Sequence, residues 1–278
     1  MRSISLPRLA SGLLLATLIT AVAAPLAAQD GKPAKPKDRY VALSAAGDPA
    51  GLVKLFQEVP HQIIPIIDSD LEGALGMYEK EGEAKRKEID ALISRAVAGA
   101  HAAVEATGQR RILDYVTSFA GWTDDQKKQF RRGQKAFGAA IQGIRSKDFD
   151  IALAKGRECR ELAEPLGDWW GTAMGLQAEG MALAGHGKME EAVTALSRSR
   201  LIYRELNLLS SALRIEGDLA DKLITLGRIP RAKAMISDGK KTAEKLGIAP
   251  LVIQFAELEK KLPKETAKKG ATTQPKKN

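Results

Sequence analysis

Side chains that could support catalysis or hold a metal ion are few in this chain and lie far apart. Its only cysteine is Cys159, and its three histidines are His61, His101 and His186. Two metal ligands on one helix must lie about one turn apart, and no pair of histidines has that spacing. A reactive thiol requires an exposed, electropositive setting, for which two neighbouring arginines give only weak support. We therefore predict a packing role for Cys159, no metal site and no bound cofactor.

The segment Gly185-His186-Gly187-Lys188 is superficially similar to a phosphate-binding loop. Such a loop also needs an earlier glycine at a fixed spacing, a following serine or threonine, and a preceding strand. The sequence provides none of these three features. We therefore reject a nucleotide site and predict that His186 is an exposed turn residue.

Carboxylates and tryptophans give no clearer indication of an active site. Glutamates cluster at Glu79, Glu81, Glu83, Glu158, Glu161 and Glu164. Both groups are interleaved with lysine or arginine, as solvated helix faces usually are. A glycosidase uses two acids from distant segments, so a helical enzyme acting on cell-wall sugar stays an alternative, but no pair stands out. Trp122, Trp169 and Trp170 lie at predicted helix boundaries, and we interpret them as packing anchors rather than sugar platforms. We expect no enzymatic activity.

A spacing of 40 residues organises the second half of the chain. Ala152, Ala192 and Ala232 are aligned by this spacing, as are Lys147, Gly187 and Gly227 before them and Leu166, Leu206 and Leu246 after them. A fixed spacing of this size is typical of stacked helical units, each of which cannot bury its apolar face alone. The pattern therefore predicts a repeat array.

The elements of this array are expected to be helices. Apolar residues recur at helical spacing, and no segment alternates with the period of two that a half-buried strand requires. Thr123 and Gln126 have the spacing of a capping box at a helix start. We predict helices over residues 126–146, 149–166, 169–185, 189–206, 209–226, 230–246 and 249–262. The fold class is therefore all-α, an α-solenoid of helix pairs that follows an N-terminal helical region.

Three columns of small residues indicate where the helices of each pair cross closely. They are Ala140, Gly180 and Ala220, then Ala152, Ala192 and Ala232, then Cys159, Ser199 and Gly239. Offsets of twelve and seven residues between these columns resemble the tetratricopeptide repeat, in its 40-residue variety, over residues 133–250. The family's usual period is 34, and its tryptophan position reads Ala136, Leu176 and Glu216 here. A period near 40 also suits HEAT-like repeats. Residues 122–262 would then form the repeats, ending in a capping helix that carries Lys260.

The resemblance implies a function in binding. In tetratricopeptide arrays the first helices of the pairs line a concave groove that holds a peptide or a segment of another protein. Alignment carries the groove positions to Gln134, Phe137, Ile141, Met174, Gln177, Met181, Arg214, Asp218 and Asp221. Their mixture of apolar anchors with a charged end suits an apolar helix or an extended peptide. The apolar members could instead pack on the N-terminal helices. The resemblance thus implies a non-catalytic scaffold or adaptor with a protein or peptide partner.

The N-terminus has the pattern of an export signal. Residues 1–28 combine a positive start, an apolar run and small residues before Gln29, which predicts a secretory signal peptide and a periplasmic or secreted protein. Retention of this segment as a membrane anchor is the alternative, although the apolar run is shorter than the about 20 residues of a span. No later segment is long and apolar enough to cross a membrane. We predict a flexible linker over 29–47, a helical region over 48–121 and a disordered basic tail over 263–278.

The formal charge of +9 is concentrated near the ends of the chain. The signal segment, residues 29–41 and the tail carry +2, +2 and +4 of it, which leaves about +1 for residues 42–262. A nucleic-acid-binding protein carries its excess charge on a folded face or groove, so we expect no nucleic-acid partner. Weak contact of the basic termini with an anionic membrane surface or envelope polymer is the alternative function.

Overall fold

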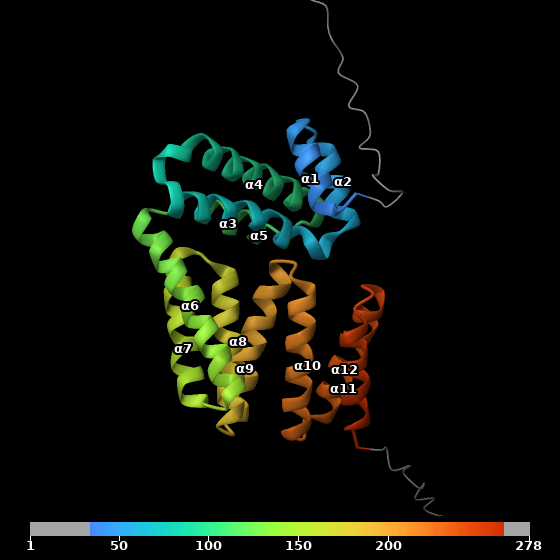
Figure 1. Cartoon of the computed structure of the whole chain (residues 1–278). Helices are drawn as coiled ribbons and strands as arrows, with labels where there is room; N and C mark the ends of the chain where they lie inside the picture. The colour runs from blue at the N-terminus through green and yellow to red at the C-terminus, as the bar shows by residue number, and fades with distance from the viewer. Residues whose placement is uncertain (1–33, 264–278) are drawn as a thin grey trace, which may run out of the picture. The chain divides into compact units, whose positions relative to one another are not determined.

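Twelve α-helices and three short 3-10 helices make up residues 34–263, the part of the chain that the computed structural model describes (Figure 1). None of these residues belongs to a strand, so the predicted all-α class is confirmed. From Lys35 onward they belong to one compact unit. The signal segment 1–28 and nearly all of the basic tail lie outside the described residues.

Five helices form the N-terminal half of this unit. They are α1 (Pro36–Ala45), α2 (Pro49–Glu58), α3 (Ile63–Glu81), α4 (Arg86–Thr107) and α5 (Arg111–Ala120), with the 3-10 turns η2 (Pro60–Gln62) and η3 (Gly82–Lys85) between them. The side chain of Asp48 caps α2 by accepting a hydrogen bond from the Gly51 amide at 2.8 Å. Pro60 cannot donate a backbone hydrogen bond, and the preceding helix ends at Glu58.

Helix α1 differs from the sequence prediction, because it occupies most of the segment 29–47 that we expected to be a linker. The segment 29–47 is polar at its start and contains three lysines, but Tyr40 within it is fully buried in the core. The Tyr40 hydroxyl donates hydrogen bonds to Asp70 at 3.1 Å and to the carbonyl of Arg95 at 2.9 Å. Arg39, one of the residues that give the segment 29–41 its positive charge, forms an ion pair with Glu58 at 2.7 Å.

Seven helices follow in sequential pairs at the positions that the 40-residue spacing predicts. They are α6 (Asp124–Ser146), α7 (Phe149–Ala163), α8 (Trp169–Gly185), α9 (Met189–Glu205), α10 (Leu209–Thr225), α11 (Ile229–Lys245) and α12 (Ala249–Lys260). Each packs against its neighbours in sequence, as a helical repeat array requires. Helix α7 is shorter than predicted, because Pro165 converts its last turn into the 3-10 helix η4 (Glu164–Leu166).

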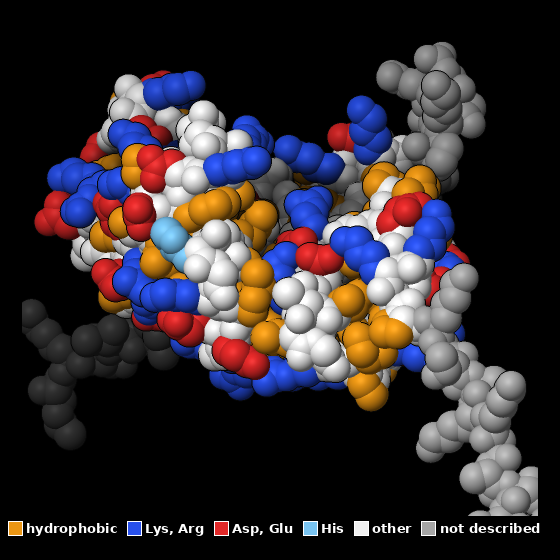
Figure 2. Space-filling view, turned by 90° about the horizontal axis from the view of Figure 1, so that it is seen from below, with side chains coloured by type: hydrophobic (Ala, Val, Ile, Leu, Met, Phe, Trp, Pro, Cys, Tyr) orange, Lys and Arg blue, Asp and Glu red, His pale blue; other side chains and the backbone are white. Residues whose placement is uncertain are grey.

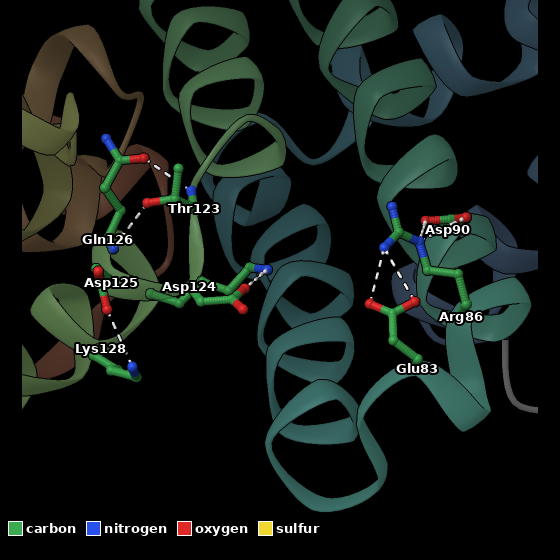
Figure 3. A network of polar contacts seen from close by, with 9 residues as sticks. Glu83, Arg86, Asp90, Thr123, Asp124, Asp125, Gln126 and Lys128 are labelled. Atoms are coloured by element: carbon green, nitrogen blue, oxygen red, sulfur yellow. Dashed lines mark hydrogen bonds and ion pairs between the residues drawn. The ribbon is translucent and has the colours of Figure 1, made fainter.

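Local capping chemistry fixes where several helices begin and turn. Thr123 and Gln126 form the predicted capping box at the start of α6, shown in Figure 3 beside the ion pairs of Arg86 with Glu83 and Asp90. The aligned turn residues Gly187 and Gly227 have φ values of 75° and 68°, which glycine adopts without steric cost. The regular spacing of these turns along the chain therefore reflects a repeated backbone conformation.

The predicted small columns lie at buried helix crossings. All three alanines of the second column are fully buried, and Ser199 of the third column is as well. A Cβ atom added at Gly180 would lie only 2.6 Å from the Cγ atom of Leu196. Larger side chains at these positions would therefore force neighbouring helices apart.

The N-terminal helices pack across one end of the repeat helices (Figure 1). Trp122 donates a hydrogen bond from Nε1 to the carbonyl of Leu166 at 2.9 Å, at the turn before α8. The Arg111 guanidinium of α5 lies 4.2 Å from the ring centre of Trp169 and forms an ion pair with Glu205. Asn207, in the turn before α10, donates to the carbonyl of Pro60. The two halves consequently share one hydrophobic core.

Candidate functional site

The first helices of three successive pairs border one hollow of about 260 Å³. Its lining includes Ile144 of α6, Met181 of α8, Asp218 and Lys222 of α10, and Phe149 and Met189 of the second helices. In the view from below in Figure 2, hydrophobic side chains reach the surface beside acidic and basic ones. The hollow therefore offers an apolar wall with one acidic and one basic group.

The two charged residues at this hollow, Asp218 and Lys222, are both half-buried. Burial raises the pKa of Asp218 above its usual range, and the nearby Lys222 ammonium opposes this shift. Lys222 also forms an ion pair with Asp221 at 2.9 Å, and Asp221 pairs with Lys261 of α12 at 2.7 Å. The Asp218 carboxyl group at the hollow is therefore poorly hydrated. A bound hydrogen-bond donor or cation would compensate for the lost hydration.

The nine predicted groove residues separate into groups. Met181 and Asp218 come together at the hollow. Gln134 and Met174 line a different cavity, and Gln134 donates to Glu72 of α3 at 2.7 Å. Gln177 accepts a hydrogen bond from the Tyr203 hydroxyl at 2.9 Å.

The remaining four predicted residues lie on α6 and α10. Phe137 and Ile141 are half-buried on α6, and Arg214 is exposed on α10. Asp221 is engaged in the ion pairs described above. The structure thus brings together only part of the predicted groove, because the N-terminal helices cover its first turns.

A second cavity, of about 160 Å³, lies where α3 and α5 meet α6, α7 and α8. Its apolar wall includes Phe130, Leu162, Ala163, Trp170 and Met174. Its polar lining consists of Asp68, Glu72, Tyr115, Gln134 and Asp168. Gln134 is exposed, so the cavity opens to solvent on the side of α6.

Two aspartates in this second cavity have strongly perturbed acidities. Burial raises the pKa of Asp168 to about 7, although its carboxylate caps α8 by accepting from the Gly171 amide at 2.8 Å. Burial also raises the pKa of Asp68 to about 6, while a hydrogen bond from the Tyr115 hydroxyl at 2.5 Å favours its charged form. Glu72, on the same helix as Asp68, forms an ion pair with Arg131 at 2.7 Å.

Cys159 lies at the edge of the same cavity and is almost fully buried, in agreement with the predicted packing role. Burial raises the pKa of its thiol to about 12, so the thiolate is not populated near neutral pH. Its Sγ atom lies 3.5 Å from the carbonyl oxygen of Gly171. His186, predicted to be an exposed turn residue, lies 3.2 Å from Asp150 at the turn after α8.

Comparisons with protein families, curated proteins and solved structures found no match to this chain. Within residues 34–263, no helix is long and apolar enough to span a membrane. No group of three or more histidine, cysteine, aspartate or glutamate side chains in that range is arranged to hold a metal ion.

The sequence did not predict the second cavity. Asp168 precedes a helix and has the residue type of an ordinary N-cap. N-caps are usually exposed, so the sequence does not show that this one is buried. Asp68 is one of several acidic residues on α3, with Asp70 and Glu72 close by, so its residue type alone does not single it out. The available signal was the position of Asp68 directly after the apolar run Ile63–Ile67.

Proposed function

We propose that this chain is an exported, non-catalytic scaffold that binds a segment of another protein through the first helices of a tetratricopeptide-like array. The hollow between α6, α8 and α10 carries the proposal, because three successive pairs contribute side chains to it. The sequential packing and the buried small columns support the tetratricopeptide resemblance. The signal-like pattern of residues 1–28 supports export.

The chemistry of the hollow suggests what the partner presents. Ile144, Met181 and Met189 provide adaptable apolar surface, and methionine accommodates varied side-chain shapes. Asp218 adds an acidic acceptor whose burial leaves it poorly solvated. We infer that the bound segment inserts a large apolar side chain beside a hydrogen-bond donor or a basic group.

Selection of peptides from a displayed random library, followed by affinity measurement, tests this proposal. Met181→Lys should weaken the binding of a selected peptide about tenfold or more, because it places a solvated charge in the apolar wall. Leu201→Lys is the matched control, since Leu201 is 52% exposed on the second helix α9. Ile144→Lys provides a second variant of the hollow in case Met181→Lys does not fold. Equal affinity of a folded hollow variant and the wild type would reject the assignment.

Deletion of residues 264–278 distinguishes groove binding from binding through the basic tail. Peptide affinity should be unchanged by this deletion and only weakly dependent on salt. Loss of peptide binding together with strong salt dependence would instead assign the contact to the basic tail.

A further inference from the structure

The second cavity has no role in the proposed partner groove, and its chemistry is different from that of the hollow. Tyr115, Phe130 and Trp170 give it an aromatic and apolar wall, whereas Asp68 and Asp168 bring two acidic groups into it. A concave apolar pocket with a few convergent polar groups of perturbed acidity is the usual form of a small-molecule site. The second cavity therefore has the form of a small-molecule site.

The two aspartates lack a cationic partner. Among residues 34–263, neither Asp68 nor Asp168 forms an ion pair with lysine, arginine or histidine. Asp168 is only 5% exposed, so water does not compensate its charge fully. Their present partners are neutral donors, the Gly171 amide for Asp168 and the Tyr115 hydroxyl for Asp68, and a buried carboxylate without a paired positive charge is costly. Arg131 stands nearby but is committed to Glu72 and Glu79.

The polar groups of the cavity are mainly acceptors. The carboxylates of Asp68 and Asp168 and the amide oxygen of Gln134 can each accept hydrogen bonds, although Gln134 already accepts one from Arg131. This set favours a cation that carries N–H donors over one that carries none. Since a water molecule takes about 30 Å³ of liquid volume, the volume of about 160 Å³ accommodates roughly five groups of that size.

We propose that this cavity binds a small alkylammonium group, with its N–H donors directed at Asp68 and Asp168 and its carbon chain against Trp170 and Met174. The group belongs either to a free amine or to a lysine side chain of a peptide. An ammonium ion would replace the missing positive partner of the two aspartates, and the apolar wall would bury its methylene groups. Aromatic rings beside the cation would add to the attraction.

Calorimetric titration of the full chain with n-butylammonium tests the proposal. 1-Butanol, which has the same chain without the charge, should bind at least about tenfold more weakly, as should tetramethylammonium, which lacks N–H donors. Nα-acetyl-lysine amide forms the third arm. Tighter binding of this compound than of butylammonium would identify a peptide side chain as the source, and weaker binding would identify a free amine.

Three variants locate the bound cation. Asp168→Asn should weaken butylammonium binding about tenfold or more, while asparagine still caps α8 and preserves the fold. Asp148→Asn, an exposed cap of the same type on α7, should leave the affinity within about twofold of the wild type. Gly133→Leu keeps both acids but fills the cavity, because a Cβ at Gly133 has no neighbour closer than 3.8 Å.

The expected result is amine binding that both Asp168→Asn and Gly133→Leu abolish or greatly weaken. Absence of butylammonium binding at millimolar concentration would overturn the proposal. Binding that survives both substitutions, or equal binding of 1-butanol, would overturn it as well. None of these results depends on the peptide affinity of the hollow between α6, α8 and α10.

Discussion

The guanidinium of Arg131 on α6 donates two hydrogen bonds to the carboxylate of Glu79 on α3, at 2.8 and 3.0 Å. Its third contact, from Nη1 to Glu72 of the same helix, measures 2.7 Å. A planar guanidinium suits such multiple contacts with carboxylates better than an ammonium does. One side chain of the repeat array thus connects to two turns of the N-terminal region.

Replacement of Arg131 should weaken the association of α3 with α6. The side chain of Arg131 is 26% exposed, and Glu79 is more exposed, so solvent screening reduces the contribution of their ion pair. We expect Arg131→Met to lower the free energy of unfolding by about 1 kcal/mol, measured by urea denaturation. The exposed neighbour provides the control, and Arg132→Met should change stability by less than about 0.5 kcal/mol. Equal effects of the two substitutions would contradict a specific role for Arg131.

At the small columns, helix packing should outweigh helix propensity, which favours alanine over glycine. Gly180→Ala should destabilise the protein by about 1–3 kcal/mol, because the new Cβ would lie 2.6 Å from Leu196. Gly138→Ala on α6 should instead stabilise it by about 0.5–1 kcal/mol, since a Cβ there meets nothing within 4 Å. Thermal or urea unfolding of both variants compares them directly. Stabilisation by Gly180→Ala would show that the crossing is looser than the structure indicates.

Asp168 should make stability depend on pH. Burial raises its pKa from 3.8 to about 7, so the folded protein binds more protons at this site than the unfolded chain between these values. The contribution of Asp168 to the free energy of unfolding therefore decreases as the pH rises through about 7. Asp168→Asn removes this dependence, and its stability relative to the wild type should improve by roughly 2–3 kcal/mol between pH 5 and pH 8.

The surroundings of Asp168 and a matched substitution define the control. The titratable and charged groups near it are Asp68, Glu72, Tyr115, Arg131 and Cys159. Asp148→Asn changes the same residue type at an exposed cap of α7 and should show no such difference between the two pH values. A pH-independent difference between Asp168→Asn and the wild type would contradict a raised pKa at Asp168.

The proposed export makes a prediction about the mature N-terminus. Cleavage after Ala28 should yield a protein that begins at Gln29, because small residues precede this position. Mass spectrometry of the protein from the envelope fraction of the producing cell measures the terminus. An intact Met1 in a membrane-bound form would support the retained anchor instead.

The repeat array could be predicted because local signals agreed with one another. The glycine turns and the capping box of Thr123 depend on residues close in sequence, and the 40-residue spacing repeats such local signals along the chain. Helix α1 was missed because its composition is that of a linker, whereas its order depends on Tyr40 reaching Asp70 on another helix. Composition alone does not reveal one buried aromatic residue in such a segment.

The candidate sites were less predictable because they depend on contacts between distant segments. Met181 and Asp218 lie on α8 and α10, and both line the same hollow. It could not show that α3 reaches Gln134, since the N-terminal region matched no known pattern. The cavity at Asp168 required two acids from opposite halves of the chain, which only the tertiary structure brings together.

Amide hydrogen exchange with a selected peptide bound tests partner recognition by the first helices most directly. Binding in the hollow should slow exchange near Ile144, Met181 and Asp218, on α6, α8 and α10, and leave the exposed surface of α9 around Leu201 unchanged. Slower exchange confined to α9 and α11, with no change on α6, α8 and α10, would contradict it.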